Sequence, residues 1–131
     1  AHLSSFDEVE RFLLSAAHGL VTGGSFVLQY VTVDALTVGD AFELPKLETD
    51  EASLERTYLR SSATEIEFRA TLRASGETPQ RISQRLLVIG DEQMQKALIH
   101  TGFHSIAVHG GFDRSPAEEG TWVRVICCSR G

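Results

Sequence analysis

Tyr30 and His109 are the side chains whose positions best suit contact with a ligand. Tyr30 comes near the carboxyl end of an almost unbroken apolar run, Ser25 to Val33, which predicts a strand. Ligands of open α/β sheets bind at that end of the strands. His109 ends another predicted strand, beside Gly110 and Gly111, where a ligand could approach the backbone. Two plainer roles stay open: core packing with a hydrogen-bonded hydroxyl for Tyr30, and a structural or solvated position for His109.

A second group of polar side chains alternates along one predicted strand. Arg56, Tyr58 and Arg60 share one face, because successive side chains of a strand point to opposite sides. If this strand belongs to a lid, Tyr58 or Arg60 could contact a substrate. The alternative is that the arginines are solvated charges that pair with Glu65 and Glu67 on a neighbouring strand.

Several classes of protein are excluded or disfavoured. The sequence has no G-x-S-x-G elbow, no H-E-x-x-H motif and no G-x-G-x-x-G loop. The net charge of -6 argues against non-specific nucleic-acid binding. No apolar run reaches the roughly 18 residues of a membrane span, and no signal peptide is visible. The only cysteines, Cys127 and Cys128, are adjacent, which predicts neither a mutual disulfide nor a zinc site. We therefore expect a reducing, cytoplasmic location.

The N-terminal elements are a helix, a glycine turn and a strand. Ser5 and Glu8 have the spacing of a capping box at the helix start. The helix carries an apolar stripe at helical spacing: Phe6, Val9, Leu13, Ala16, Ala17 and Leu20. Gly23 and Gly24 then turn the chain into the strand Ser25 to Val33. Because this strand is apolar at consecutive positions, we expect it to be buried on both faces.

The middle of the chain predicts an antiparallel meander. Residues Asp34 to Leu54 show little periodicity and include Pro45, so we expect a loop there. Apolar and polar residues then alternate from Glu65 to Ala74, which is typical of a half-buried strand. Its expected partners are Arg56 to Ser61 and Gln80 to Ile89, giving three strands.

The C-terminal part predicts a helix and a hairpin. Asp91 is the expected N-cap of the helix, and Gly102 falls where a left-handed residue ends it. Strands are expected at His104 to His109 and Thr121 to Ser129, joined by a long loop. We expect one domain in three parts: 1–33, 34–89 and 90–131.

The order of these motifs resembles the C-terminal half of a class I S-adenosylmethionine-dependent methyltransferase, a Rossmann-like α/β family. The segment GLVTGGSFVL is similar to the family's L-x-P-G-G turn and fifth strand, with Thr22 in place of proline. An antiparallel insertion follows. LLVIGDEQMQKALIHTGFHSIAVHGGFD resembles the helix, the "GF" junction, the sixth strand and the following loop. WVRVICCSR resembles the closing antiparallel seventh strand.

The resemblance implies an incomplete fold: strands five to seven with an antiparallel meander insertion, without the cofactor-binding half. S-adenosylmethionine would bind only if an N-terminal half is supplied, and a small molecule would accept the methyl group. The strand 25–33 would have one bare edge, which either the missing half or a second copy should cover. Residues Ala1 to Ser5 would lie at the substrate mouth, which makes His2 the candidate catalytic base; a frayed terminal histidine is the alternative.

A rival reading treats the chain as a freestanding α+β module for ligand binding, cyclase-like chemistry or dimerisation. That reading expects a strongly bent sheet around an apolar pocket. It also expects a stable monomer without a bare strand edge.

Overall fold

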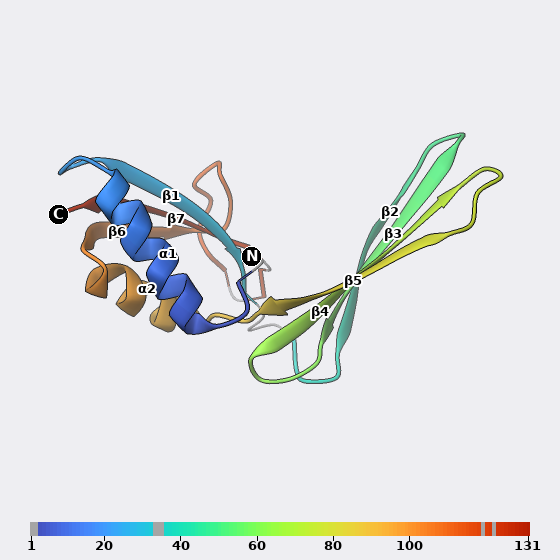
Figure 1. The fold of residues 1–131 in the computed structure, drawn as a ribbon, viewed down its shortest axis with the longest axis horizontal. Helices are drawn as coiled ribbons and strands as arrows, with labels where there is room; N and C mark the ends of the chain where they lie inside the picture. Colours follow the sequence, from blue (N-terminus) through green and yellow to red (C-terminus); the bar gives the residue numbers. More distant parts are fainter. Residues whose placement is uncertain (1–2, 33–35, 119, 122) are drawn as a thin grey trace. The chain divides into compact units, whose positions relative to one another are not determined.

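The computed structural model describes residues 3–32, 36–118, 120–121 and 123–131 (Figure 1). The chain divides into two compact units. The first comprises residues 3–35 and 88–131, and the second residues 36–87. The predicted division into 1–33, 34–89 and 90–131 within one domain stays a prediction.

The first unit contains two helices and a three-stranded sheet within the described residues. Helix α1 spans Phe6–Gly19 and α2 spans Asp91–His100. Strands β1 (Ser25–Val31), β6 (Phe103–His109) and β7 (Val123–Arg130) form a sheet in the order β1-β7-β6. Both pairings with β7 are antiparallel. The predicted closing hairpin is therefore confirmed, with β7 in the centre. Figure 1 shows α1 and α2 beside each other, next to this sheet.

Local sequence explains how α1 begins and how the chain turns into β1. The Ser5 hydroxyl accepts a hydrogen bond from Glu8 N at 3.3 Å, as predicted, and Glu8 accepts from the backbone of Ser4 at 2.7 Å. The turn needs both glycines. Gly23 has a φ of 76°, a region that favours glycine, and a Cβ on Gly24 would lie 2.8 Å from Val21 O.

The prediction of a doubly buried strand was wrong for β1 and suits β7 instead. β1 alternates: Tyr30 is buried, whereas Val27 on the other face is 53% exposed. β7 buries Val125 and Ile126, which lie on opposite faces. The physical reason is position, because β7 is the central strand and β1 is at the edge of the sheet.

The two cysteines face opposite sides of β7, because successive side chains of a strand alternate between its faces. Cys128 is buried and its thiol lies 3.7 Å from Phe26 O, while Cys127 is half-buried. Burial raises the pKa of the Cys128 thiol to about 11. Both cysteines are free.

The start of α2 corrects one prediction. Gly90, with an extended backbone, is the N-cap, and Asp91 is the first helical residue. The Asp91 carboxylate instead makes contacts with two other elements, described below. Gly102, with a φ of 94°, follows the helix as expected.

The second unit is a four-stranded antiparallel sheet in the order β2-β3-β4-β5. Its strands are β2 (Ala41–Glu48), β3 (Ala52–Arg60), β4 (Glu65–Ala74) and β5 (Gln80–Leu87). The meander is confirmed, but the predicted loop over 34–54 was wrong, since β2 and the start of β3 lie there. Pro45 argued against a strand there, because proline cannot donate a hydrogen bond to a neighbouring strand. It is tolerated because β2 is an edge strand with a register shift between Leu44 and Leu47.

No helix among the described residues has the length and hydropathy needed to span a membrane.

Candidate functional site

The first unit gathers polar side chains at the carboxyl end of β1. Tyr30 lies there, 5% exposed, followed by Thr32, which is 1% exposed. Two other elements reach this end: α2 through Asp91 and β7 through Arg124, which pairs with Tyr30 across the sheet. Asp91 and Arg124 follow Tyr30 by 61 and 94 positions in the chain, and the fold brings all three side chains together.

Asp91 is the centre of this cluster. Its Oδ1 accepts a hydrogen bond from the Tyr30 hydroxyl at 2.5 Å, and its Oδ2 accepts from Arg124 Nε at 2.8 Å. The Arg124 side chain is only 5% exposed, so its charge has lost most of its water. An arginine in such a position needs a carboxylate partner and further acceptors. Thr121 supplies these through its carbonyl oxygen, at 3.1 Å, and its hydroxyl.

The plainer reading of Tyr30, packing in the core with a hydrogen-bonded hydroxyl, describes its geometry. The Tyr30–Asp91–Arg124 network joins β1, α2 and β7 at one point. It fixes the carboxyl end of β1, where a ligand would bind in an open α/β sheet. Sequence reasoning missed Asp91 and Arg124 as site residues. A charged residue inside the apolar run Val123 to Cys128 was the signal that could have revealed Arg124.

The hydrogen bonding of the Thr32 side chain is incomplete in the described part of the chain. Its Oγ1 is buried and has no hydrogen-bond partner in the described part of the chain. A buried hydroxyl without a partner costs about 1–3 kcal/mol. The position therefore calls for an acceptor or donor from outside the described residues.

The outer edge of β1 is also unpaired within the described residues. Arg130 N donates to Gly24 O at 2.9 Å, which makes Gly24 and Arg130 a hydrogen-bonded pair. Since such pairs alternate along antiparallel strands, the amides of Phe26, Leu28 and Tyr30 point to β7. The amides that point to the open edge are those of Ser25, Val27, Gln29 and Val31.

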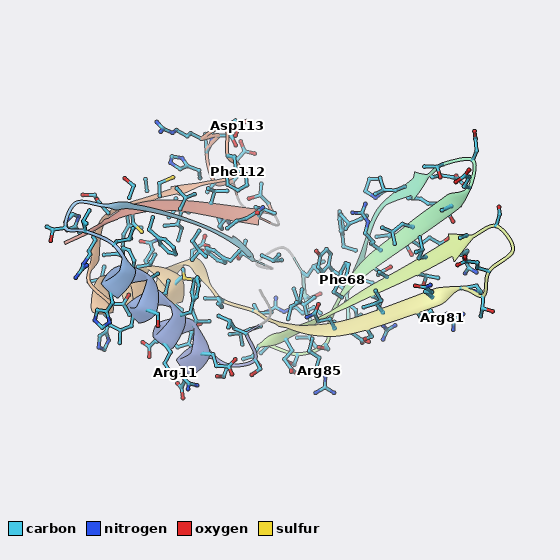
Figure 2. The ribbon with its side chains drawn as sticks, turned by 45° about the horizontal axis from the view of Figure 1, so that its top comes forward. Arg11, Phe68, Arg81, Arg85, Phe112 and Asp113 are labelled. Atoms are coloured by element: carbon cyan, nitrogen blue, oxygen red, sulfur yellow. The ribbon has the colours of Figure 1, made fainter. Side chains whose placement is uncertain are left out.

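His109 lies elsewhere, on the face of the sheet that also carries Val27 and Cys127. It lines an open cavity of about 420 Å³ together with Val27, Cys127 and Arg114. The neighbouring loop is folded tightly, because Gly110 N donates to Ser115 O at 2.9 Å and a Cβ on Gly110 would meet Pro116 O at 2.6 Å. Figure 2 shows Phe112 and Asp113 at the tip of this loop. Tyr30 and His109 are therefore not brought together: Tyr30 is in the Asp91 cluster and His109 in this cavity.

Tyr58 and Arg60 belong to the second unit. The Tyr58 ring packs against Phe68, with ring centroids 5.0 Å apart. The Arg60 guanidinium donates to the carbonyl oxygens of Ser62 and Ala63 at 3.3 and 3.4 Å, and to Leu36 O. It thereby holds the turn between β3 and β4.

One of the two carboxylates predicted to pair with Arg56 or Arg60, that of Glu67, has other partners. Glu67 accepts from Arg69 at 2.7 Å and from Ser83 at 2.6 Å. The Arg69 hydrogen bond, followed by that of Ser83, lowers the pKa of Glu67 to about 2. His2, the predicted catalytic base, lies outside the described residues.

The glycines do not form a cradle for a nucleotide-like cofactor. Gly23 and Gly24 precede β1 instead of following a strand, and their turn is closed on Val21 and Arg130. Gly110 and Gly111 lead into no helix, and a Cβ on Gly111 would lie 2.8 Å from Asp113 Oδ1. A phosphate or ribose site of the usual kind needs a strand, a glycine loop and a helix. The described residues therefore do not fit S-adenosylmethionine by themselves. Within those same residues, no group of three His, Cys, Asp or Glu side chains could hold a metal ion.

Replacing Asp91 should destabilise the chain strongly. In Asp91→Ala, the buried Arg124 guanidinium loses its counter-charge and Tyr30 loses its acceptor, so unfolding should become easier by about 2–3 kcal/mol. Glu92→Ala is the matched control, since Glu92 is the next helix residue and its ion pair with Lys96 joins two exposed side chains. It should change the free energy of unfolding by about 0.5 kcal/mol or less. Equal losses in the two variants, measured by urea unfolding, would contradict the network.

Replacing Thr32 by valine should leave the chain as stable or more stable. Valine keeps the shape and removes the unpaired hydroxyl, for a gain of up to about 1 kcal/mol in urea unfolding. Thr101→Val is the control, because the buried Thr101 hydroxyl donates to Ala97 O at 2.8 Å and should cost about 1 kcal/mol when lost. A loss from Thr32→Val as large as that from Thr101→Val would show that the Thr32 hydroxyl is bonded.

The fold is similar to known structures, although no protein-family model and no curated protein matches the sequence. A S-adenosylmethionine-dependent methyltransferase from Clostridium acetobutylicum matches 99% of this chain with 54% of its own, at 14% identity and a TM-score of 0.79. The CcbJ methyltransferase from Streptomyces caelestis matches 99% with 56% of its own, at 17% identity and 0.81. CalS10 is an amino pentose methyltransferase from Micromonospora echinaspora solved with S-adenosylmethionine bound. It matches 98% of this chain with 53% of its own, at 16% identity and a TM-score of 0.65.

The chain thus spans about half the length of each of these proteins. It has the α/β fold, with antiparallel sheets, of about half of a class I S-adenosylmethionine-dependent methyltransferase.

Proposed function

We propose that this chain is the substrate-side, C-terminal half of a small-molecule methyltransferase that uses S-adenosylmethionine. The open edge of β1 carries the proposal, since it is where the other half of the sheet would pair. That edge has none of the usual protection against strand pairing. Ser25, Val27, Gln29 and Val31, whose amides point outward, include no charge and no proline.

The second sheet shows what a protected edge looks like in the same chain. Edge strand β2 contains Pro45, Lys46 and a register shift, and edge strand β5 carries Arg81 and Arg85. These features disfavour pairing with another strand. The contrast with β1 supports the view that β1 receives a partner strand and that β2 and β5 do not.

The chemistry of this half would be positioning. Methyl transfer from a sulfonium depends mainly on proximity and alignment, with at most one general base. The Tyr30–Asp91–Arg124 network would hold the carboxyl end of β1 rigid as one wall of the site. The Thr32 hydroxyl would find its partner in the other half or in a ligand. The cofactor would be held by that other half, because the described residues offer no cradle for it.

The class of methyl acceptor is proposed from the similar structures. CalS10 is described as an amino pentose methyltransferase, which supports a small-molecule acceptor here. Tyr30, Tyr58, Arg60 and His109 stay candidate substrate contacts, and His2 stays the candidate base. A reducing, cytoplasmic location stays a proposal from the sequence, whose only two cysteines are adjacent. The rival reading as a freestanding ligand-binding or cyclase-like module is disfavoured, because it requires a sheet without an open edge.

Supplying the missing half should create cofactor binding. The 131-residue chain alone should bind no S-adenosylmethionine in calorimetry. A chimera that joins it to the part of CcbJ that the chain does not match should bind one equivalent. Binding by the chain alone would contradict the proposal, and so would a folded chimera that binds none.

A single substitution on the open edge provides the matched control. In Gln29→Pro, proline removes an amide that points away from β7, so the chain alone should fold normally. The same substitution in the chimera should abolish binding, because it blocks pairing with the added half. A Gln29→Pro chimera that binds as well as the parent would rule out pairing along β1.

A further inference from the structure

Two polar groups at the carboxyl end of β1 lack a hydrogen-bond partner in the described part of the chain. The first is the hydroxyl of Thr32, a residue that is 1% exposed. The second is Nη2 of Arg124, whose side chain is 5% exposed. The hydrogen bonds of this guanidinium within the described residues all use Nε or Nη1. Buried polar groups in native proteins are nearly always paired, so two such groups in one place indicate that a ligand belongs there.

Both groups lie on the side of the sheet that carries α2. Tyr30 and Arg124 are directly opposite each other in the register of β1 and β7, and both bind Asp91 of α2. Burial alternates along β1 and continues past its end, since Tyr30 is buried, Val31 is half-buried and Thr32 is buried. Thr32 therefore follows Tyr30 onto the same face. It is a diagonal neighbour of Arg124, at about 7–8 Å, so one ligand with several oxygens can reach both.

The charge of this cluster favours a neutral ligand. Arg124 is paired with Asp91 at 2.8 Å, so the two side chains together have no net charge. A carboxylate or phosphate would bring an extra negative charge into a place that is largely shielded from water. The net charge of -6 on the chain disfavours anions further. The groups without partners are the N–H groups of Arg124 Nη2 and the Thr32 hydroxyl, and they call for an uncharged oxygen.

A hydroxyl group fits the cluster better than a carbonyl or an ether oxygen. An ionised carboxylate has about four acceptor positions, so the hydrogen bonds from Tyr30 and Arg124 leave positions on Asp91 for a ligand. The Asp91 side chain is 30% exposed, which makes it accessible. A ligand hydroxyl can accept from Arg124 or Thr32 and also donate to Asp91, whereas a carbonyl or ether oxygen can only accept.

We propose that the carboxyl end of β1 holds a binding site for a neutral small molecule with several hydroxyl groups. Thr32 Oγ1 and Arg124 Nη2 donate to the ligand, and the Asp91 carboxylate accepts from it. That this ligand is the methyl acceptor rests on the proposed function. The site itself is built from the first unit of this chain alone.

Titration of the full chain with methyl β-D-xylopyranoside, a neutral ring with several hydroxyls, tests the site. NMR follows the methyl group of Thr32 and the Nε–H of Arg124. Both signals should shift saturably, with a Kd on the order of millimolar for a ligand of this size. Tetrahydropyran, which is the same ring without hydroxyls, should leave both signals unchanged, and so should acetate, because it is an anion.

Thr32→Val removes the proposed contact and keeps the shape of the side chain. It should fold, because the hydroxyl has no partner within the described residues. Binding of the glycoside, followed at Arg124, should weaken by about 10-fold. Thr101→Val is the matched control: it also removes a buried threonine hydroxyl, but one that donates to Ala97 O and Leu98 O in α2. It should bind the glycoside as tightly as the parent chain does.

Three results would overturn the site. The first is the absence of saturable shifts with the glycoside, which would mean that water satisfies both groups. The second is an equal response to tetrahydropyran, which would show that the hydroxyls are not recognised. The third is equal affinity of Thr32→Val and Thr101→Val for the glycoside.

The chimera with the added half separates the site from the proposed function. It should bind both S-adenosylmethionine and the glycoside. A chimera that binds the cofactor and not the glycoside would show that the added half itself occupies these donors, which overturns the site and leaves the methyltransferase proposal standing. Glycoside binding by the chain, together with a folded chimera that binds no cofactor, would support the site and contradict the proposed function.

Discussion

The unpaired edge of β1 is the constraint on which the rest of the account depends. A strand that offers four outward-pointing peptide groups without charge, proline or bulge is an open template for pairing. In this sheet β7 receives a neighbour on both sides and β1 on one. The order β1-β7-β6 thus leaves the sheet extendable at β1, and the similar methyltransferases are about twice as long as this chain.

The Tyr30–Asp91–Arg124 network stabilises the carboxyl end of β1. Arg124 lies in the central strand with almost no access to water. Its buried charge therefore needs the carboxylate of Asp91 as a partner. Tyr30 uses the remaining carboxylate oxygen and ties the edge strand to the same point. Three elements that meet at the carboxyl end of β1 are thereby held by one carboxylate. Thr32, just beyond, is the one member of this region whose hydrogen bonding is incomplete in the described residues.

Sequence patterns predicted the elements well where a local cause exists. The cap at Ser5, the glycine turn before β1 and Gly102 after α2 each depend on neighbouring residues, and each was confirmed. Burial depends on which strands are neighbours, so the apolar runs of β1 and β7 could not be told apart until the sheet order was known. β2 was missed because Pro45 hides a strand that only an edge position allows. Asp91 has the sequence signal of an N-cap, and its tertiary role depends on Arg124, 33 residues later.

Hydrogen exchange of individual β1 amides tests the central claim most directly. In the chain alone, the amides of Phe26, Leu28 and Tyr30 should be protected by β7, whereas those of Val27, Gln29 and Val31 should exchange at rates close to those of free peptides. Joined to the added half, both sets should be protected. Equal protection of both sets in the chain alone would mean that the β1 edge is already covered, and would contradict the account.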